Sequence, residues 1–277
     1  MIDVEAKVAR HYGDGALQAA IDAGWAKARA GSEAAPVDQL AAVDEFHIGG
    51  RAATEMVCER LELAPGLRVL DVGCGLGGAA RYMASRNGVD VEGVDLTPEY
   101  VEVGNALTGQ VGLDGKVRLM QASALALPHA EARFDRASLF HVGMNIEDKA
   151  RLFAEIARVL KPGGRLAVYD VMRVGEGAIE FPMPWAPDEG ASFVARPEDY
   201  EAALAAAGMR VRTVESKTDI ALSFFAAMKA RMAQGGPPPL GLHILMGAET
   251  GAKVANMARG VTSGAIAPVL LLAGRDA

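Results

Sequence analysis

Cysteine is scarce in this chain of 277 residues, which contains only Cys58 and Cys74. Two cysteines provide no disulfide framework, and neither stands beside another cysteine or histidine at metal-binding spacing. The five histidines are scattered along the chain and form no pattern with carboxylates that suggests a bound cation. We therefore expect no metal, and we interpret both cysteines as small buried residues.

Long apolar runs and excess positive charge are also missing. No run approaches the roughly 18 apolar residues of a membrane span, and residues 1–14 (MIDVEAKVARHYGD) are charged and lack an apolar signal core. Lys and Arg total 28 against 35 Asp and Glu, which gives a net charge of −7. No basic stripe with interleaved aromatic residues overrides this balance, so we expect no nucleic-acid partner. From the missing apolar segments we expect a cytoplasmic protein without a membrane partner.

Apolar residues make up 51% of the chain, enough for one large α/β domain over residues 1–277. Residues 1–62 read as a helical N-terminal cap, interrupted at 31–36 and at Gly49–Gly50. Strands and helices then alternate, which predicts a parallel sheet with right-handed crossovers and ligands at the carboxyl ends of its strands. The predicted strands are residues 67–73, 90–95, 116–121, 134–140, 164–171, 209–217 and 264–273.

The alternation stops at residues 173–195, which contain glycines, three prolines and several aromatic residues. A connection of this length in a compact domain is usually functional or disordered, and its aromatic content argues against disorder. We therefore interpret residues 173–195 as a lid. Residues 196–277 then continue the core with helices near 197–207, 219–233 and 246–259 and the last two strands.

The most informative segment is residues 69–78 (VLDVGCGLGG), where a strand runs through an acid into a glycine cluster and a helix. Glycines allow close backbone approach, and a helix N-terminus favours polar or anionic ligands. The glycine spacing, with Asp95 about 20 residues on, also satisfies the fingerprint of dinucleotide-binding domains. However, Asp71 would repel a pyrophosphate and attract a cationic amino-acid tail. S-adenosylmethionine (SAM) has such a tail and no phosphate, so we favour it over a nicotinamide dinucleotide.

Residues 71–78 resemble the first motif of class I SAM-dependent methyltransferases, and four further segments resemble later motifs in the same order. These are residues 91–96 (VEGVDL), 119–128 (LMQASALALP), 134–145 (FDRASLFHVGMN) and 160–168 (LKPGGRLAV). The resemblance implies a Rossmann-like, seven-stranded, mostly parallel sheet with helices on both faces. It also implies a SAM-binding core at residues 63–172 and an antiparallel edge formed by the last two strands.

The same resemblance implies which residues hold SAM and the product S-adenosylhomocysteine. Asp95 would bind the ribose, and Ser123 stands where the family often has an acid for the adenine amino group. Serine accepts that hydrogen bond more weakly, so adenine recognition would rely more on its neighbours. The implied cofactor-binding residues are Asp71, Gly73, Gly75, Gly77, Asp95, Leu96, Ser123, Ala124, Leu125 and Phe140.

Further segments, such as 43–54 (VDEFHIGGRAAT) and 181–186 (FPMPWA), resemble bacterial small-molecule methyltransferases of the sarcosine and dimethylglycine N-methyltransferase-like group. This narrower resemblance favours a small-molecule acceptor and N-methylation of an amine. Methylation at oxygen, sulfur or carbon of a quinone-like or other secondary metabolite is the alternative. A SAM-binding protein without methyl transfer is the alternative from another class. The apolar last strand and the Met-containing helices are compatible with a homodimer.

His141 is the catalytic candidate, because it follows the fourth strand where the methyl group should lie and its ordinary pKa suits proton removal. Its alternative role is to orient the loop through backbone hydrogen bonds. Asn145 could bind the acceptor or cap the following helix. Phe181 and Trp185 could line the pocket or anchor the lid on the core. The predicted acceptor-binding residues are Tyr12, His47, Asn145, Asp170, Phe181, Trp185 and His243.

Overall fold

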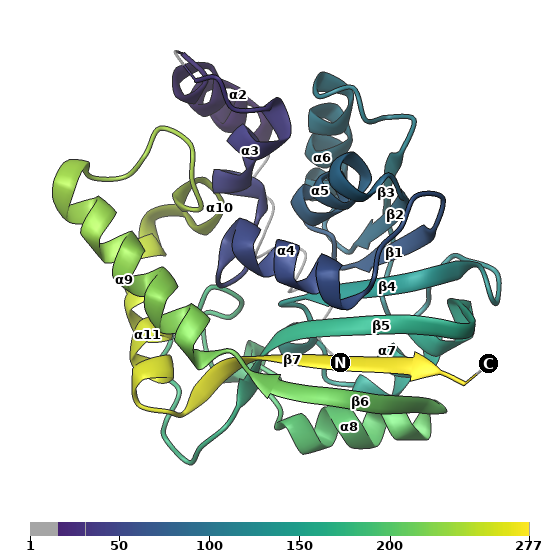
Figure 1. The fold of residues 1–277 in the computed structure, drawn as a ribbon. Coiled ribbons are helices and arrows are strands. Elements are labelled where there is room, and N and C mark those ends of the chain that lie inside the picture. The colour runs from purple at the N-terminus through teal and green to yellow at the C-terminus, as the bar shows by residue number, and fades with distance from the viewer. Residues whose placement is uncertain (1–15, 31, 277) are drawn as a thin grey trace.

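The computed structural model describes residues 16–30 and 32–276, which form a seven-stranded sheet with helices on both faces (Figure 1). The strand order is β3-β2-β1-β4-β5-β7-β6. The first five strands pair in parallel, and β7 pairs antiparallel with both β5 and β6. The strands are β1 (Arg68–Val72), β2 (Asp90–Asp95), β3 (Val117–Gln121), β4 (Phe134–Phe140), β5 (Leu160–Arg173), β6 (Met209–Ser216) and β7 (Ile266–Arg275).

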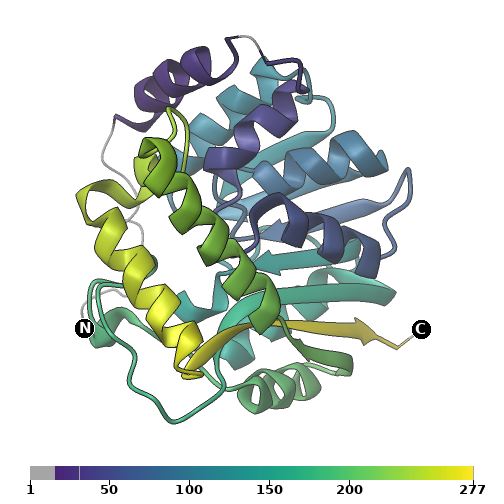
Figure 2. The ribbon, with the colours of Figure 1, turned by 60° about the vertical axis from the view of Figure 1, so that its left-hand side comes forward.

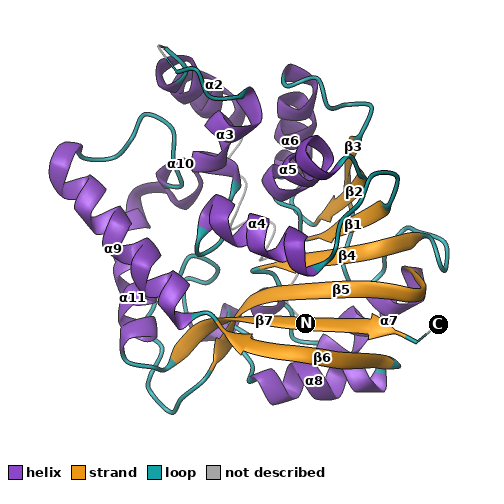
Figure 3. Ribbon diagram, viewed as in Figure 1, coloured by secondary structure: helices purple, strands orange, loops and turns teal. Residues whose placement is uncertain are grey.

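Helices cover both faces of the sheet. Because the central strands carry apolar side chains on both faces, each face forms an apolar cluster with the helices that cover it. Leu70 and Val72 of β1 pack in one cluster with residues of α7 and α8, and Val69 packs in the other with residues of α4 and α5. Figure 3 shows these two pairs of helices on opposite faces of the sheet. Parallel strands covered on both sides read as continuous apolar runs. These helices are α4 (Gly50–Arg60), α5 (Gly78–Asn87), α6 (Pro98–Gln110), α7 (Lys149–Val159) and α8 (Pro197–Ala206).

A second group of helices covers the carboxyl ends of the strands. Residues far apart in the sequence meet there, since Leu240 packs with Trp25 and Leu40 in one buried cluster. Figures 1 and 2 both show α9 and α11 side by side beyond the end of the sheet. These helices are α2 (Leu17–Ala28), α3 (Pro36–Asp44), α9 (Thr218–Gly235), α10 (His243–Met246) and α11 (Thr250–Thr262); short 3₁₀ turns are η1 (Gly143–Asn145), η2 (Glu189–Ala191) and η3 (Gly247–Glu249).

The structure confirms the predicted fold class, including seven strands near their expected positions. The last two strands do pair antiparallel, but β7 lies inside the sheet and β6 forms its edge. The predicted helix at 246–259 is divided by a turn at Gly247, whose φ is +68°. None of the described helices combines the length and apolar character that a membrane crossing requires.

Candidate active site

The glycine turn after β1 has the backbone conformation that its sequence predicts. Gly73, Gly75 and Gly77 all have positive φ, between +54° and +81°. The N–H groups of Gly73 and Cys74 both donate to the carbonyl of Val94 on β2, at 2.8 and 3.0 Å. The turn is thereby held against the end of the neighbouring strand, and α5 begins at the next glycine.

Asp95 ends β2 and lies beside this turn. Its Oδ2 accepts the N–H of Gly75 at 2.8 Å, and its Oδ1 accepts the N–H of Thr97 at 2.9 Å. Burial raises the pKa of Asp95, and these backbone hydrogen bonds oppose that rise. The carboxylate is therefore fixed in position at the edge of the cavity, where the resemblance places the ribose.

Asp71 lies inside β1 and is almost fully buried. Burial raises its pKa to about 7, although a hydrogen bond from the Ser138 hydroxyl at 2.7 Å opposes the rise. Nearby Asp95 raises it further. A cation placed in the cavity would favour the ionised form of Asp71, so this carboxyl is suited to a positively charged ligand group.

The segment between α3 and α4 contributes a set of buried charged groups to the cavity. Asp44 pairs with Arg81 at 2.7 Å, and both side chains are buried. Glu45 lies 2.7 Å from Arg51, and burial raises the Glu45 pKa to about 7 while Arg51 opposes that rise. These pairs fix residues 44–49, which we call the cap segment and which carry His47 over the glycine turn.

His47 is held through one ring nitrogen. Its Nε2 lies 3.1 Å from the carbonyl oxygen of Gly50 and from the Thr54 hydroxyl, and 3.3 Å from Glu45 Oε2. A carbonyl oxygen can only accept, so Nε2 carries the hydrogen. Burial lowers the His47 pKa to about 3, with neighbouring His141 adding to the effect. The neutral ring therefore has an unprotonated Nδ1, and it stacks on Phe140 with ring centroids 4.9 Å apart.

His141 lies directly after β4 and has a φ of +54°, which is unusual for a residue with a side chain. Its Nε2 accepts the backbone N–H of Ile48 at 3.2 Å, and its Nδ1 donates to the carbonyl of Tyr169 at 3.1 Å. Burial lowers the His141 pKa to about 4. Both ring nitrogens are thus engaged with the backbone, which corresponds to the loop-orienting role considered for this residue.

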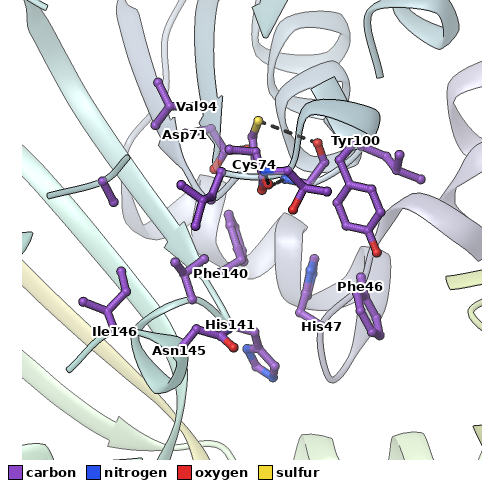
Figure 4. Close-up of a pocket in the computed structure, with 18 of the residues that line it drawn as sticks. Phe46, His47, Asp71, Cys74, Val94, Tyr100, Phe140, His141, Asn145 and Ile146 are labelled. Atoms are coloured by element: carbon purple, nitrogen blue, oxygen red, sulfur yellow. Dashed lines mark hydrogen bonds between the residues drawn. The ribbon is translucent and has the colours of Figure 1, made fainter. Parts of the chain in front are cut away.

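These groups surround one cavity of about 280 Å³ at the carboxyl ends of β1, β2 and β4 (Figure 4). In Figure 4, Phe46 and His47 approach from the cap segment, and His141 and Asn145 lie beyond the end of β4. Of the predicted cofactor residues, those lining the cavity are Asp71, Gly73, Gly75, Asp95, Leu96, Ala124, Leu125 and Phe140.

Two buried oxygens in the cavity wall, Asp44 Oδ1 and Asn145 Oδ1, have no hydrogen-bond partner among the described residues. Buried acceptors of this kind normally have a donor, so their position indicates a ligand that donates hydrogen bonds. SAM offers an ammonium group, ribose hydroxyls and an adenine amino group. Gly75 also lines the cavity, and a methyl group added at this glycine would meet no atom within 4 Å. The site therefore fits this cofactor.

A second, smaller cavity lies on the other side of His47 and His141. Together with Phe46, these two histidines line both cavities. The remaining wall is apolar and comes largely from α9, α10 and α11. We call this cavity the apolar chamber; its lining residues are Phe46, His47, Ile48, His141, Pro184, Phe224, Phe225, Met228, Leu242, Met246, Val254 and Met257.

Several predicted residues lie outside the walls of both cavities. Asp170 is buried and accepts a hydrogen bond from the Tyr200 hydroxyl at 2.7 Å. Trp185 donates to the Ser192 hydroxyl at 3.0 Å and packs in the same buried apolar cluster as Phe181. The other residues outside the walls are Gly77, which is the N-cap of α5, Ser123, whose hydroxyl accepts the Leu125 N–H, and His243 at the start of α10; Tyr12 lies outside the described residues.

The sequence reasoning missed several wall residues. Asp44 lies inside the segment 43–54 that contains His47, and Thr97 follows Asp95 by two positions, so membership of or proximity to these motifs could have indicated both residues. Asn145, which was predicted, lines the cavity from η1, but its alternative role as the helix cap is wrong. The cap of α7 is Asp148, a missed wall residue, which accepts the N–H of Arg151 at 2.8 Å. Other missed wall residues of the larger cavity are Phe46, Cys74, Leu76, Ala79, Val94, Tyr100, Ala122, Val142, Ile146, Glu147 and Leu245.

No group of three or more histidine, cysteine, aspartate or glutamate side chains among residues 16–30 and 32–276 has the geometry of a metal site. The expectation that the protein needs no metal stays a prediction.

Comparison with known proteins matches the segment that carries most of this site to a known domain. Residues 70–168 match the family described as "Methyltransferase domain". The methyltransferase GfsG of Streptomyces halstedii is 36% identical over 130 residues, which cover 47% of each chain. Other relatives are described as O-, C- and N-methyltransferases. The chain spans no more than about half the length of the first curated relatives that it matches.

Solved structures with this fold cover more of the chain. Geranyl diphosphate C-methyltransferase from Streptomyces coelicolor is 20% identical, with a TM-score of 0.72 over 98% of both chains. The [4+2]-cyclase SpnF is 26% identical, with a TM-score of 0.64, over 81% of this chain and 80% of that one. The predicted resemblance to class I methyltransferases and the Rossmann-like fold are therefore confirmed, and SAM is supported as the cofactor.

Proposed function

We propose that the protein transfers the methyl group of SAM to a small-molecule acceptor. One observation carries the proposal. Asp71 and Asp95 stand in the wall of one cavity, joined by the glycine turn, within the segment that matches a methyltransferase domain. A carboxyl inside β1 suits a cationic tail, and a fixed carboxylate at the end of β2 suits a pair of hydroxyls. A dinucleotide would instead bring a pyrophosphate towards Asp71.

The residues that line the cavity support a position for each part of SAM. The ammonium end would lie near Asp71 and the glycine turn, and the ribose hydroxyls would donate to Asp95. The adenine would lie between Leu96 and Leu125, since both line the cavity. When bound, SAM supplies an electrophilic methyl group on a positively charged sulfur.

The protein's own contribution is to align the reactants and exclude water. Alignment of two reactants can remove roughly 7–11 kcal/mol from a reaction barrier. His141 ties the end of β4 to the cap segment through Ile48, so it would hold the boundary between the two cavities in place. We therefore assign His141 to positioning, because neither ring nitrogen is available to remove a proton.

The acceptor class follows from the cavity on the other side of this boundary. N-methylation of an amine rests on the resemblance to the sarcosine and dimethylglycine group, and an amine site should contain carboxylates or an aromatic cage. The apolar chamber instead supports the alternative, a quinone-like or other apolar metabolite. A homodimer and a cytoplasmic location stay predictions.

A SAM-binding protein that catalyses a different reaction is the second candidate. The structural similarity to the cyclase SpnF supports it, because a protein described by another activity has the same fold. Under this hypothesis the purified protein binds SAM but releases no methylated product from any acceptor.

The test combines binding with transfer. SAM affinity is measured by calorimetry for the wild type, for Asp95→Ala and for the control Asp90→Ala, an exposed carboxylate at the other end of β2. We expect about 10- to 100-fold weaker binding for Asp95→Ala alone, from the loss of hydrogen bonds to a charged group. The purified protein is then mixed with SAM carrying an isotopically labelled methyl group and with a bacterial metabolite extract. Labelled products found by mass spectrometry support methyl transfer, and equal SAM affinity of all three proteins contradicts the assigned site.

A further inference from the structure

The apolar chamber adjoins the place where a bound SAM would present its methyl group. Phe46, His47 and His141 form the shared wall between the two cavities. The far wall consists of Phe224, Phe225 and Met228 of α9 with residues of α10 and α11. A molecule in the chamber would therefore meet the cofactor cavity at the two histidines.

The chamber is unsuited to a charged occupant. None of the described residues that line it is Asp, Glu, Lys or Arg, and the two histidines are its only residues with ionisable side chains. Burial keeps both histidines neutral by lowering their pKa values to about 3 and about 4. Placing an unpaired ammonium or carboxylate in such surroundings costs far more free energy than placing an apolar group there.

The size of the chamber also restricts its occupant. Its volume is about 40 Å³, so an occupant must displace side chains. Three of the lining residues are methionines, Met228, Met246 and Met257, and methionine is unbranched and adapts readily to the shape of its neighbours. Phe224, Phe225 and Met228 are also only partly buried, so α9 offers a wall that can rearrange.

His47 adds one specific polar contact at the boundary. Its Nε2 hydrogen is used by the carbonyl oxygen of Gly50, whereas its Nδ1 has no hydrogen-bond partner among the described residues. An unprotonated ring nitrogen can only accept. An occupant that satisfies His47 must therefore carry a donor, such as a hydroxyl group, at the end nearest the cofactor cavity.

We propose that the apolar chamber binds the methyl acceptor, and that this acceptor is an uncharged, largely apolar molecule whose hydroxyl group donates a hydrogen bond to Nδ1 of His47. Naming the occupant as the acceptor rests on the proposed methyltransferase function. The existence of an apolar binding site and the contact with His47 do not depend on it.

The first experiment measures binding of N-phenyl-1-naphthylamine, an uncharged fluorescent probe of apolar sites, to the protein saturated with S-adenosylhomocysteine. Met228→Glu places a carboxylate in the chamber, and Ala227→Glu is its matched control on the exposed side of α9. We expect Met228→Glu to weaken probe binding about tenfold or more and Ala227→Glu to leave it unchanged. Equal binding by the two variants, or no binding by the folded wild type, would overturn the proposal.

The second experiment uses competitors of the probe. In the wild type, 1-naphthol should displace the probe about two- to tenfold more effectively than naphthalene, the expected gain from one hydrogen bond. In His47→Phe, whose fold is checked by circular dichroism and by S-adenosylhomocysteine binding, that ratio should fall to about one. The hydroxyl contact is wrong if the ratio survives the substitution. Displacement by dimethylglycine or choline at comparable concentration would overturn the uncharged class.

The two proposals fail in different ways. Probe binding by a protein that binds neither SAM nor S-adenosylhomocysteine would keep the apolar site and reject the methyltransferase function. Cofactor binding without probe binding would keep the methyltransferase function and reject the apolar site.

Discussion

Gly73 provides a sharp test of the proposed cofactor site, because two separate costs can be read from its position. Its φ is +70°, a conformation that costs an L-residue about 1–2 kcal/mol. A methyl group at Gly73 would also lie 2.2 Å from Cγ2 and 2.8 Å from Cγ1 of Val142. Valine is restricted about χ1 and cannot easily turn away, so the overpacking adds about 1–3 kcal/mol. We expect Gly73→Ala to lower the free energy of unfolding by about 2–5 kcal/mol in total.

Gly75 is the matched control in the same turn. Its φ is +54°, but an added methyl group would meet no atom within 4 Å. Gly75→Ala should therefore cost only the conformational term of about 1–2 kcal/mol. Because Gly75 lines the cofactor cavity, this variant should weaken SAM binding more than its small effect on stability suggests.

Urea denaturation followed by circular dichroism measures these differences, with constant slope as the condition for comparing variants. The double variant Gly73→Ala/Val142→Ala removes the clash and leaves the conformational cost. A double-mutant cycle should therefore show a favourable coupling of about 1–3 kcal/mol between the two positions. If Gly73→Ala is no more destabilising than Gly75→Ala, or the coupling is zero, the packing of the turn against the end of β4 is wrong.

Three further predictions concern buried polar groups. Burial raises the pKa of Asp71 to about 7, and a cationic ligand needs the ionised form of this carboxyl. SAM affinity measured by calorimetry should therefore rise about tenfold between about pH 6 and pH 8. The variant Asp71→Asn should show no such rise. His141→Ala leaves the Ile48 N–H without its acceptor and should lower the free energy of unfolding by about 1–3 kcal/mol. If the pH dependence of labelled product formation differs between this variant and the wild type, His141 removes a proton and the positioning role is wrong. Arg81→Met leaves the Asp44 carboxylate buried and unpaired at a cost of about 3–5 kcal/mol. Adding Asp44→Leu should recover stability in urea without recovering SAM affinity.

Most of the cofactor-binding residues predicted from the sequence line one cavity, because that side of the cavity is built from local sequence patterns. Asp71 lies near the carboxyl end of β1 and Asp95 ends β2, and parallel strands bring such ends to one edge of the sheet. The glycines need positive φ for reasons that a few neighbouring residues determine.

The acceptor side could not be predicted in the same way. Phe224, Met228 and Met257 lie on two helices that meet only in the folded protein. The sequence predicts both helices, but α9 has apolar residues on several sides and only Ala221 is fully buried. Which of its faces turns towards the cavity is decided by packing against α11. Trp185 illustrates the reverse case, since a residue type typical of binding sites packs instead in the core.

The two histidines show why residue type alone did not settle their roles. Backbone partners decide the tautomer of each ring. His47 donates from Nε2 to the nearby Gly50 carbonyl. His141 uses both ring nitrogens, with backbone groups that are distant in the sequence. The N–H of Ile48 donates to His141, and its carbonyl accepts from the Tyr169 hydroxyl at 3.1 Å. The cap segment is thereby clamped to the end of β4 and to Tyr169 within β5. Since His47 directly precedes Ile48, this clamp also fixes the free nitrogen of His47, so His141 contributes by holding His47 at the boundary between cofactor and acceptor.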